Sequence, residues 1–234
     1  MNTRVSASIA IMAILLLGTG HATGAKLETE SESVELAGAE SVRVKIEMGA
    51  GELKVAGGSD ELLSADFTYT IGACKPRIEY SVSGSRGFLI VEQPKVEWGF
   101  RRYRCEWDLY LNSSVPMDLS VDLGAGEGYL ELGSLSLTEL DVDMGVGDIT
   151  VDLVGDWKND LDASIDGGVG EITLLLPPDV GIRIDATRGI GAINAYGLKR
   201  EGSAYVNDAY GESEVTLRIN VDLGVGKVNL ELGE

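Results

Sequence analysis

A short glycine motif, Gly-x-Gly, recurs six times in this chain, and each copy lies between stretches in which apolar and polar residues alternate. Such alternation is typical of half-buried β-strands. Four successive copies begin 21, 23 and 21 residues apart, at Gly124, Gly145, Gly168 and Gly189. A period of this length is typical of solenoids, in which each repeat buries its apolar face against its neighbours. The sequence therefore predicts an all-β solenoid with rungs of about 21–23 residues.

The phase of the alternation predicts what the motif does. Around Gly145, apolar residues occupy even positions through Val146 and odd positions from Ile149 onward. A continuous strand would keep its parity, because its side-chain period is two. The motif therefore predicts a corner between two faces, where glycine supplies backbone freedom. We expect the residues between the glycines to point into the core as one column: Ala50, Ala125, Val146, Val169, Ile190 and Val225.

The first 25 residues are typical of a signal peptide. Arg4 precedes an unbroken apolar run from Ile9 to Leu17, and small residues follow. Cleavage is expected after Ala22 or Ala25. The run is about half as long as a membrane span, and no later segment is long and apolar enough. We therefore expect a mature protein without a membrane span, exported to the periplasm or the exterior.

Charge and histidine content exclude several classes of function. The formal net charge is −19, which disfavours nucleic acids and anionic lipid surfaces as partners. The only histidine, His21, lies in the predicted signal peptide. The mature chain therefore lacks the imidazole that most hydrolase nucleophile pairs and many metal sites require. We expect no catalytic residues and no nucleic-acid partner.

The region from about residue 62 to 111 departs from the repeat. It contains both cysteines, Cys74 and Cys105, and a disulfide between them would suit an exported protein. Two buried free thiols are the alternative. We expect residues 26–115 to form N-terminal rungs with a strand insertion clamped by the disulfide. Residues 116–234 should form the solenoid repeats, in one continuous domain with the first part, and residues 198–202 a loop.

The same region contains the chain's only basic cluster, interleaved with aromatic residues. Arginine and aromatic side chains together can stack on sugar rings or bind an acidic group. An alternative is plain strand alternation beside the disulfide. The candidate binding patch consists of Trp98, Phe100, Arg101, Arg102, Tyr103, Arg104 and Trp107.

Carboxylates flank the glycine motif on both sides. Stacked rungs would place equivalent residues about 4.8 Å apart, and oxygen ligands at such separations suit Ca²⁺. The candidate calcium ligands are Asp122, Asp143, Asp166, Glu127, Asp148 and Glu171. The alternative is a solvated acidic edge that blocks aggregation. Carboxylate pairs for glycoside hydrolysis would recur at every rung, which indicates a repeat feature and not a tuned catalytic site.

Several motifs resemble a known bacterial family. They are the segments 107–111, 115–119, 176–182 and 205–211, together with the unit Asp-Leu-Gly-Ala-Gly-Glu. In this order they resemble the toast-rack or DUF4097-like group, whose members include proteins labelled adhesins and whose relatives include the extracellular part of LiaF-type envelope-stress proteins. The resemblance covers about residues 40–234. It implies a right-handed single-stranded β-helix at the cell envelope without catalytic residues, and it includes neither the cysteine pair nor the arginine-rich segment.

Together these observations predict a non-catalytic, exported β-solenoid that acts as a scaffold or interaction module at the bacterial envelope. Its partner would be an envelope protein or a glycan, and its ends could mediate self-association. One alternative is a Ca²⁺-dependent or saccharide-binding adhesive module. Another, from a different class, is a polysaccharide-active β-helix enzyme. No cofactor other than Ca²⁺ is expected.

Overall fold

The computed structural model describes residues 10–11, 27–70, 74–94 and 104–233. Of the predicted signal peptide, only β1 (Ala10–Ile11) falls within this part. The described residues form β-strands and contain no α-helix, so the prediction of an all-β fold is confirmed. None of these residues belongs to a helix long and apolar enough to cross a membrane.

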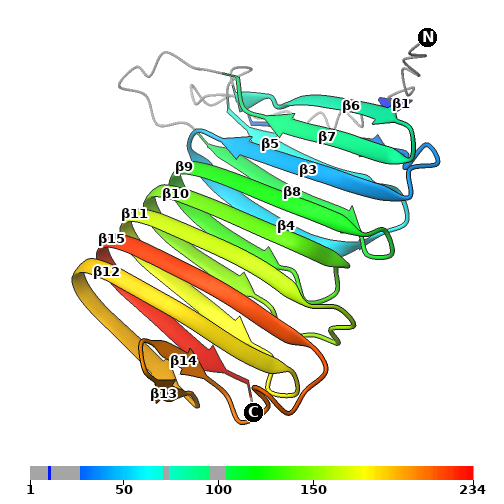
Figure 1. Cartoon of the computed structure of the whole chain (residues 1–234). Coiled ribbons are helices and arrows are strands. Elements are labelled where there is room, and N and C mark those ends of the chain that lie inside the picture. The colour runs from blue at the N-terminus through cyan, green and yellow to red at the C-terminus, as the bar shows by residue number, and fades with distance from the viewer. Residues whose placement is uncertain (1–9, 12–26, 71–73, 95–103, 234) are drawn as a thin grey trace.

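Five long strands each form a complete rung. They are β9 (Met117–Glu131), β10 (Leu137–Asp152), β11 (Leu161–Leu176), β12 (Gly181–Tyr196) and β15 (Thr216–Leu232). Each strand runs through a Gly-x-Gly motif and bends back there, so that its two halves lie in opposite layers (Figure 1). The rungs stack in parallel, and the result is an open, β-helix-like sheet.

The N-terminal part extends both layers. β3 (Ser41–Met48) and β4 (Gly51–Ser59) form a further rung that is interrupted at its corner, and both pair with β9. β7 (Arg86–Glu92) and β6 (Arg77–Ser83) continue the layer of β3. β8 (Cys105–Asn112), β5 (Leu63–Tyr69) and β2 (Glu28–Val34) continue the layer of β4.

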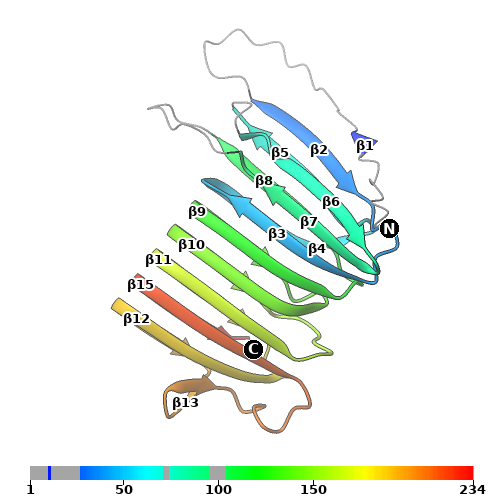
Figure 2. The same ribbon diagram turned by 45° about the horizontal axis from the view of Figure 1, so that its top comes forward.

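The rungs do not stack in the order of the sequence. The order is β9, β10, β11, β15, β12, so the last strand of the chain lies between β11 and β12 (Figure 2). In the connection from β12 to β15, β13 (Lys199–Glu201) and β14 (Ala204–Val206) form a hairpin, and β14 pairs with the start of β12. The expectation of a loop over residues 198–202 is therefore wrong for Lys199–Glu201, which pairs with β14.

The core lies between the two layers. In β10, Leu140, Val142 and Met144 are buried before the corner, and Ile149 and Val151 are buried after it. The equivalent positions of neighbouring rungs are stacked in register, so one apolar cluster runs from Val34 to Leu230. Full burial of one such aliphatic side chain stabilises a fold by about 1.5–3 kcal/mol. The rungs therefore depend on one another for stability.

The structure confirms the corners but reverses the direction of their central side chains. Val146, Val169, Val225 and Ile190 are 55%, 47%, 42% and 72% exposed, and Ala50 and Ala125 are half-buried. The predicted inward column is therefore wrong. Met144 and Ile149 fill the core on the two sides of the corner, and the central residue lies on the outer side of the bend. The alternation thus stops at Met144 and resumes at Ile149.

The two glycines of each motif meet different constraints. A Cβ on Gly147 would come closer than 3.0 Å to the carbonyl oxygen of Gly126 in the adjacent rung, and one on Gly145 would do the same at Gly124. Both positions therefore need glycine because the backbones approach closely. The second glycine of every copy also has a positive φ, which is 141° at Gly147. Residues other than glycine rarely adopt this backbone conformation.

Candidate functional site

The corners stack into one edge of the molecule, which we call the corner edge; it is the left edge in Figure 1. The central residues of the motifs are in register along it and form what we call the apolar row: Ala125, Val146, Val169, Val225 and Ile190. At a strand spacing of about 4.8 Å, the row is about 19 Å long. Glycines border it on both sides, so no neighbouring side chain from those positions covers the valines.

Two columns of acidic residues flank the apolar row. The first acidic column contains Glu47, Asp122, Asp143, Asp166 and Asp222, and ends at Thr187 in β12. The second contains Glu106, Glu52, Glu127, Asp148 and Glu171, and ends at Lys227 and Ala192. The six predicted calcium ligands therefore lie in two separate columns, three in each.

Repulsion within the first acidic column is only partly compensated. Partial burial and the neighbouring charges of Asp122 and Asp166 raise the pKa of Asp143. Lys45, at the β3 end of the column, donates a hydrogen bond to Glu47 over 2.8 Å, and this contact raises the pKa of the Lys45 amine. In the second column, Lys227 Nζ lies 3.7 Å from Glu171 Oε2, and Asn229 donates to Glu171 over 2.6 Å.

A shallow hollow of about 590 Å³ lies along the first acidic column. It is lined by Asp122, Asp143, Asp166, Asp222 and the adjacent corner glycines. Within the described part of the chain, no group of three or more Asp, Glu, His or Cys side chains is arranged to hold a metal ion. The calcium assignment therefore stays a prediction that this geometry does not strengthen.

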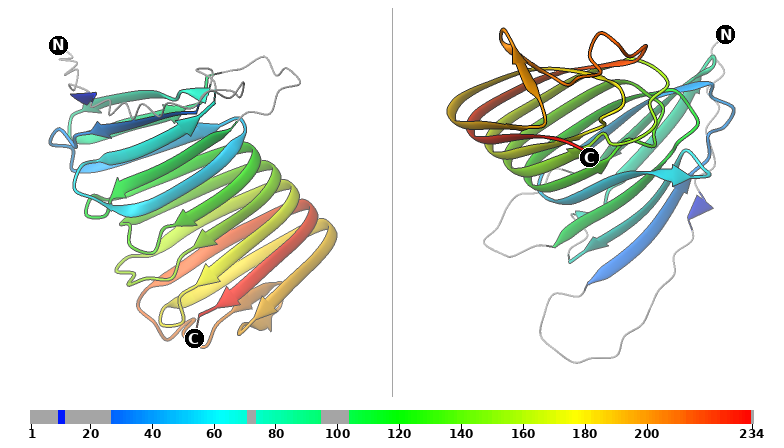
Figure 3. Two further views of the ribbon diagram at one scale, coloured as in Figure 1. Left: turned by 180° about the vertical axis from the view of Figure 1, so that it is seen from behind. Right: turned by 90° about the horizontal axis from the view of Figure 1, so that it is seen from below.

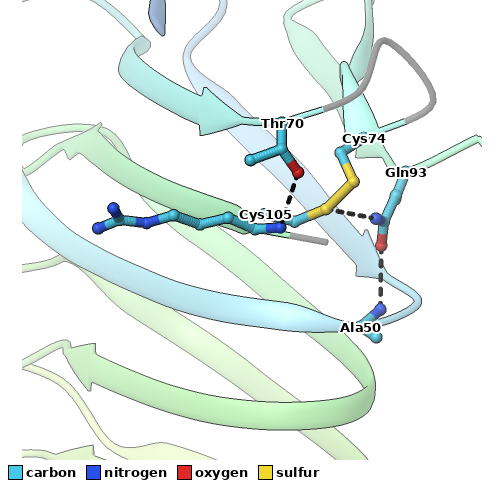
Figure 4. Close-up of a disulfide and its surroundings, with 6 residues drawn as sticks. Ala50, Thr70, Cys74, Gln93 and Cys105 are labelled. Carbon is cyan, nitrogen blue, oxygen red and sulfur yellow. Dashed lines mark hydrogen bonds between the residues drawn. A yellow bond between two sulfur atoms is a disulfide. The ribbon is translucent and has the colours of Figure 1, made fainter. Parts of the chain in front are cut away.

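The structure contains the Cys74–Cys105 disulfide, with a Cα–Cα distance of 5.8 Å (Figure 4). Gln93 connects it to the first corner: its Oε1 accepts a hydrogen bond from the Ala50 amide over 3.0 Å, and its Nε2 lies 3.5 Å from Cys105 Sγ. On the other side, the Arg104 amide donates to Thr70 Oγ1 over 3.0 Å. The disulfide therefore fixes β8 beside the corner of β3 and β4.

The predicted arginine–aromatic patch is only partly described. Trp98, Phe100, Arg101, Arg102 and Tyr103 lie outside the described residues. Arg104 is exposed and forms an ion pair with Glu106. Trp107 is 1% exposed and packs edge-on against Phe67, with ring centroids 5.6 Å apart. The prediction that Trp107 belongs to a surface patch is therefore wrong. In β8 its side chain lies on the same face as those of Cys105 and Leu109, and this face is buried in the core.

Sequence reasoning missed two buried asparagines at the edge opposite the corners. Asn207 accepts a hydrogen bond from the Ile182 amide over 2.9 Å and donates to the Val180 carbonyl over 2.7 Å. Asn112 similarly accepts from the Ser114 amide and donates to the Ser59 and Asp60 carbonyls. Each side chain replaces missing strand hydrogen bonds in a loop. An asparagine directly after an apolar strand was the available signal.

The opposite edge also carries a second hollow, of about 470 Å³. Serines and glycines of successive loops line it, together with Asp156, Trp157 and Lys158. Trp157 is mostly buried, and its indole donates to the Leu153 carbonyl over 2.7 Å. Leu135, Leu137 and Val154 also line the hollow, so its surface is mixed and not polar throughout.

Comparison with known families gives two matches. The N-terminal domain of toast_rack, DUF2154, matches residues 23–175. A family described as cell wall-active antibiotics response LiaF, C-terminal, matches residues 128–230. No curated protein matches the chain.

Among solved structures, the chain is similar to a "putative cell adhesion protein" from Clostridium sporogenes. The two are 36% identical with a TM-score of 0.86, over 89% of this chain and 100% of the other. A "putative adhesin" from Bacteroides fragilis aligns over 89% of this chain and 100% of its own length, at 17% identity and a TM-score of 0.33. Only the first of these two matches is close enough to support an argument.

Proposed function

The chain belongs to the toast-rack family, and from this premise we propose that it is a non-catalytic scaffold or interaction module at the bacterial cell envelope. The observation that carries the proposal is the corner edge. Its exposed aliphatic and acidic side chains repeat from rung to rung, which gives an extended surface and no single convergent site. Extended repeat surfaces of this kind suit the binding of other macromolecules.

Two further observations support a role outside the cytoplasm. The disulfide suits an oxidising compartment, and the first residues have the composition of a signal peptide. The similar protein from C. sporogenes carries a cell-adhesion label, and the second family match is described as a response to cell wall-active antibiotics. We propose that this chain, too, is exported and acts in the envelope.

Catalysis is the weaker hypothesis. A catalytic carboxylic acid needs an environment that distinguishes it from its neighbours, whereas the carboxylates here recur in register along two columns. Neither family match describes an enzyme. A polysaccharide-active enzyme therefore has no particular residue to support it among those described.

Calcium-dependent adhesion is the second candidate: carboxylates line the hollow along the first acidic column, although no three of them among the described residues are arranged to hold a metal ion. Titration calorimetry of the purified protein with Ca²⁺ tests it. Heat of binding together with a raised melting temperature would support calcium as a ligand. No heat and an unchanged melting temperature would exclude it.

The proposed function is tested by cell fractionation followed by chemical cross-linking. We expect the protein in the envelope or exported fraction, linked there to a defined partner. Recovery from the cytoplasm alone, or turnover of a polysaccharide by the purified protein, would contradict the proposal. Self-association through the solenoid ends remains a further proposal, which sedimentation analysis of the purified protein addresses.

A further inference from the structure

We propose that the corner edge binds a basic segment of a partner protein, in which a row of aliphatic side chains is bordered by Lys or Arg. The aliphatic side chains would pack on the apolar row, and the basic groups would reach the two acidic columns. This inference rests on the proposed function, because it names the surface and the partner chemistry of the same interaction module.

The apolar row carries the first part of the argument. Four β-branched side chains, Val146, Val169, Val225 and Ile190, are 42–72% exposed although the core of the same rungs is nearly closed to solvent. Single exposed aliphatic residues are ordinary, but a contiguous row marks a contact surface. Packing does not require valine or isoleucine here, since Ala125 occupies the equivalent position in β9. The fold therefore leaves these methyl groups free for a partner.

Charge complementarity identifies the partner. Among the described residues, Asp122, Asp143, Asp166 and Asp222 make no ion pair. Partial burial and repulsion from Asp122 and Asp166 raise the pKa of Asp143, and the charge of Lys45 offsets only part of this. The hollow beside the apolar row is lined by the same four carboxylates, so a Lys or Arg side chain can enter it while a neighbouring aliphatic side chain packs on the row. A cationic partner would relieve the repulsion, and electrostatic attraction would also speed its encounter.

The same charges disfavour the other occupants. A second copy of this chain also has a net charge of −19. If the two corner edges faced each other, the acidic columns of one copy would repel those of the other. An anionic lipid surface would be repelled in the same way. A neutral apolar segment would partly desolvate the carboxylates beside the interface without supplying counter-charges. Such desolvation of unpaired charges costs free energy.

The test uses three synthetic peptides of equal length, each long enough to span about 19 Å of strand stacking. One alternates Lys and Val, one alternates Lys and Ser, and one alternates Glu and Val. Binding to the purified protein is measured by fluorescence anisotropy at low and at physiological ionic strength. We expect the Lys–Val peptide to bind at least tenfold more tightly than either of the others, and more weakly as salt is raised.

Matched variants locate the surface. V146S/V169S/V225S removes the apolar row, and F88S/Y110S removes two exposed apolar side chains elsewhere. D122N/D143N/D166N neutralises the first acidic column, and E40Q/E61Q/E212Q removes the same charge from exposed positions away from it. We expect each corner variant to weaken binding of the Lys–Val peptide at least tenfold and each control to change it less than threefold. Circular dichroism checks that all four remain folded.

Four outcomes overturn the inference. Three of them are equal binding of the Lys–Ser and Lys–Val peptides, equal effects of corner and control variants, and no binding of the Lys–Val peptide at all. A dimer that depends on Val146 and Val169 would instead identify a second copy as the occupant and would equally overturn it. The proposed function is judged separately, because cross-linking to an envelope partner that survives V146S/V169S/V225S leaves an interaction module with a different binding surface.

Discussion

Each corner depends on two glycines that are required for different reasons. Position 145 requires glycine only because the backbone of Gly124 leaves no room for a side chain. Position 147 requires it for the same steric reason, next to Gly126, and also because its φ is 141°. Gly84 provides the opposite case, with a φ of 63° and nothing near the position of its absent Cβ. Backbone strain and steric contact can therefore be separated within one chain.

We predict that alanine substitutions will follow this order. Gly84→Ala should lower the free energy of unfolding by about 1 kcal/mol, the cost of a left-handed conformation. Gly145→Ala should cost more, because a backbone of the neighbouring rung has to move. Gly147→Ala should cost most, about 3 kcal/mol or more. Urea unfolding measures all three, and a Gly147→Ala variant no less stable than Gly84→Ala would contradict this account of the corners.

At this scale the sequence predicted the role of the glycines but not the direction of the residue between them. The shift in parity between Val146 and Ile149 correctly indicated a bend. Extending the alternation through Val146 was the error, since the buried positions are Met144 and Ile149. Alternation identifies faces only while the strand is straight, and an exposed valine has the same sequence signature as a buried one.

Between neighbouring strands, the parallel register that aligns the core also aligns like charges. Asp122, Asp143 and Asp166 are paired across adjacent rungs, and so their repulsion is built into the stacking. Lys45 offsets part of it at one end, and Thr187 takes the acidic position in β12. Ala192 does the same in the second acidic column, so the terminal rung carries neither carboxylate.

This repulsion predicts that Asp143→Asn stabilises the protein. Partial burial and the neighbouring charges of Asp122 and Asp166 raise the folded-state pKa of Asp143 above its ordinary value of 3.8, so the folded state binds the proton more readily than the unfolded chain. Stability from this group is therefore present at low pH and lost as the pH rises through the raised pKa. At neutral pH the substitution should add up to about 1 kcal/mol, the size of one such repulsion in water.

Thermal unfolding at neutral pH and near pH 3 measures the effect, with Glu212→Gln as a control that removes one exposed charge elsewhere. The gain should disappear at the lower pH, where Asp143 is protonated in both states. An equal gain from the control, or a gain that persists at low pH, would show that repulsion within the column is not its cause.

The position of β15 could not be predicted from the sequence. Its pattern is that of any other rung, and motif spacing favours stacking in chain order. The structure instead places β15 between β11 and β12, with the β13–β14 hairpin connecting across the end (Figure 3). Only long-range pairing decides this order, because the local sequence of a rung does not specify which neighbour it will have. The acidic columns, by contrast, followed directly from the repeat.

The whole molecule is a stack of rungs, and its two edges differ in structure and in the roles we assign to them. At the edge opposite the corners, which we call the loop edge, Asn112 and Asn207 form hydrogen bonds with the buried backbone of the connecting loops. At the corner edge, glycines allow tight stacking and leave exposed aliphatic and acidic side chains in ordered rows. The disulfide joins Cys74 to Cys105 at the start of β8, and Gln93 beside it hydrogen-bonds to the first corner at Ala50. We therefore place stability in the core and the loop edge, and interaction at the corner edge.

Site-specific photo-cross-linking in cells tests this division most directly. A photoreactive residue is introduced at Val146 or Val169 on the corner edge, or at Val154, which is 48% exposed in the loop after β10. The account predicts a discrete cross-linked partner from positions 146 and 169 and none from position 154. Cross-linking from position 154 alone, or no adduct from either corner position in a correctly localised protein, would contradict it.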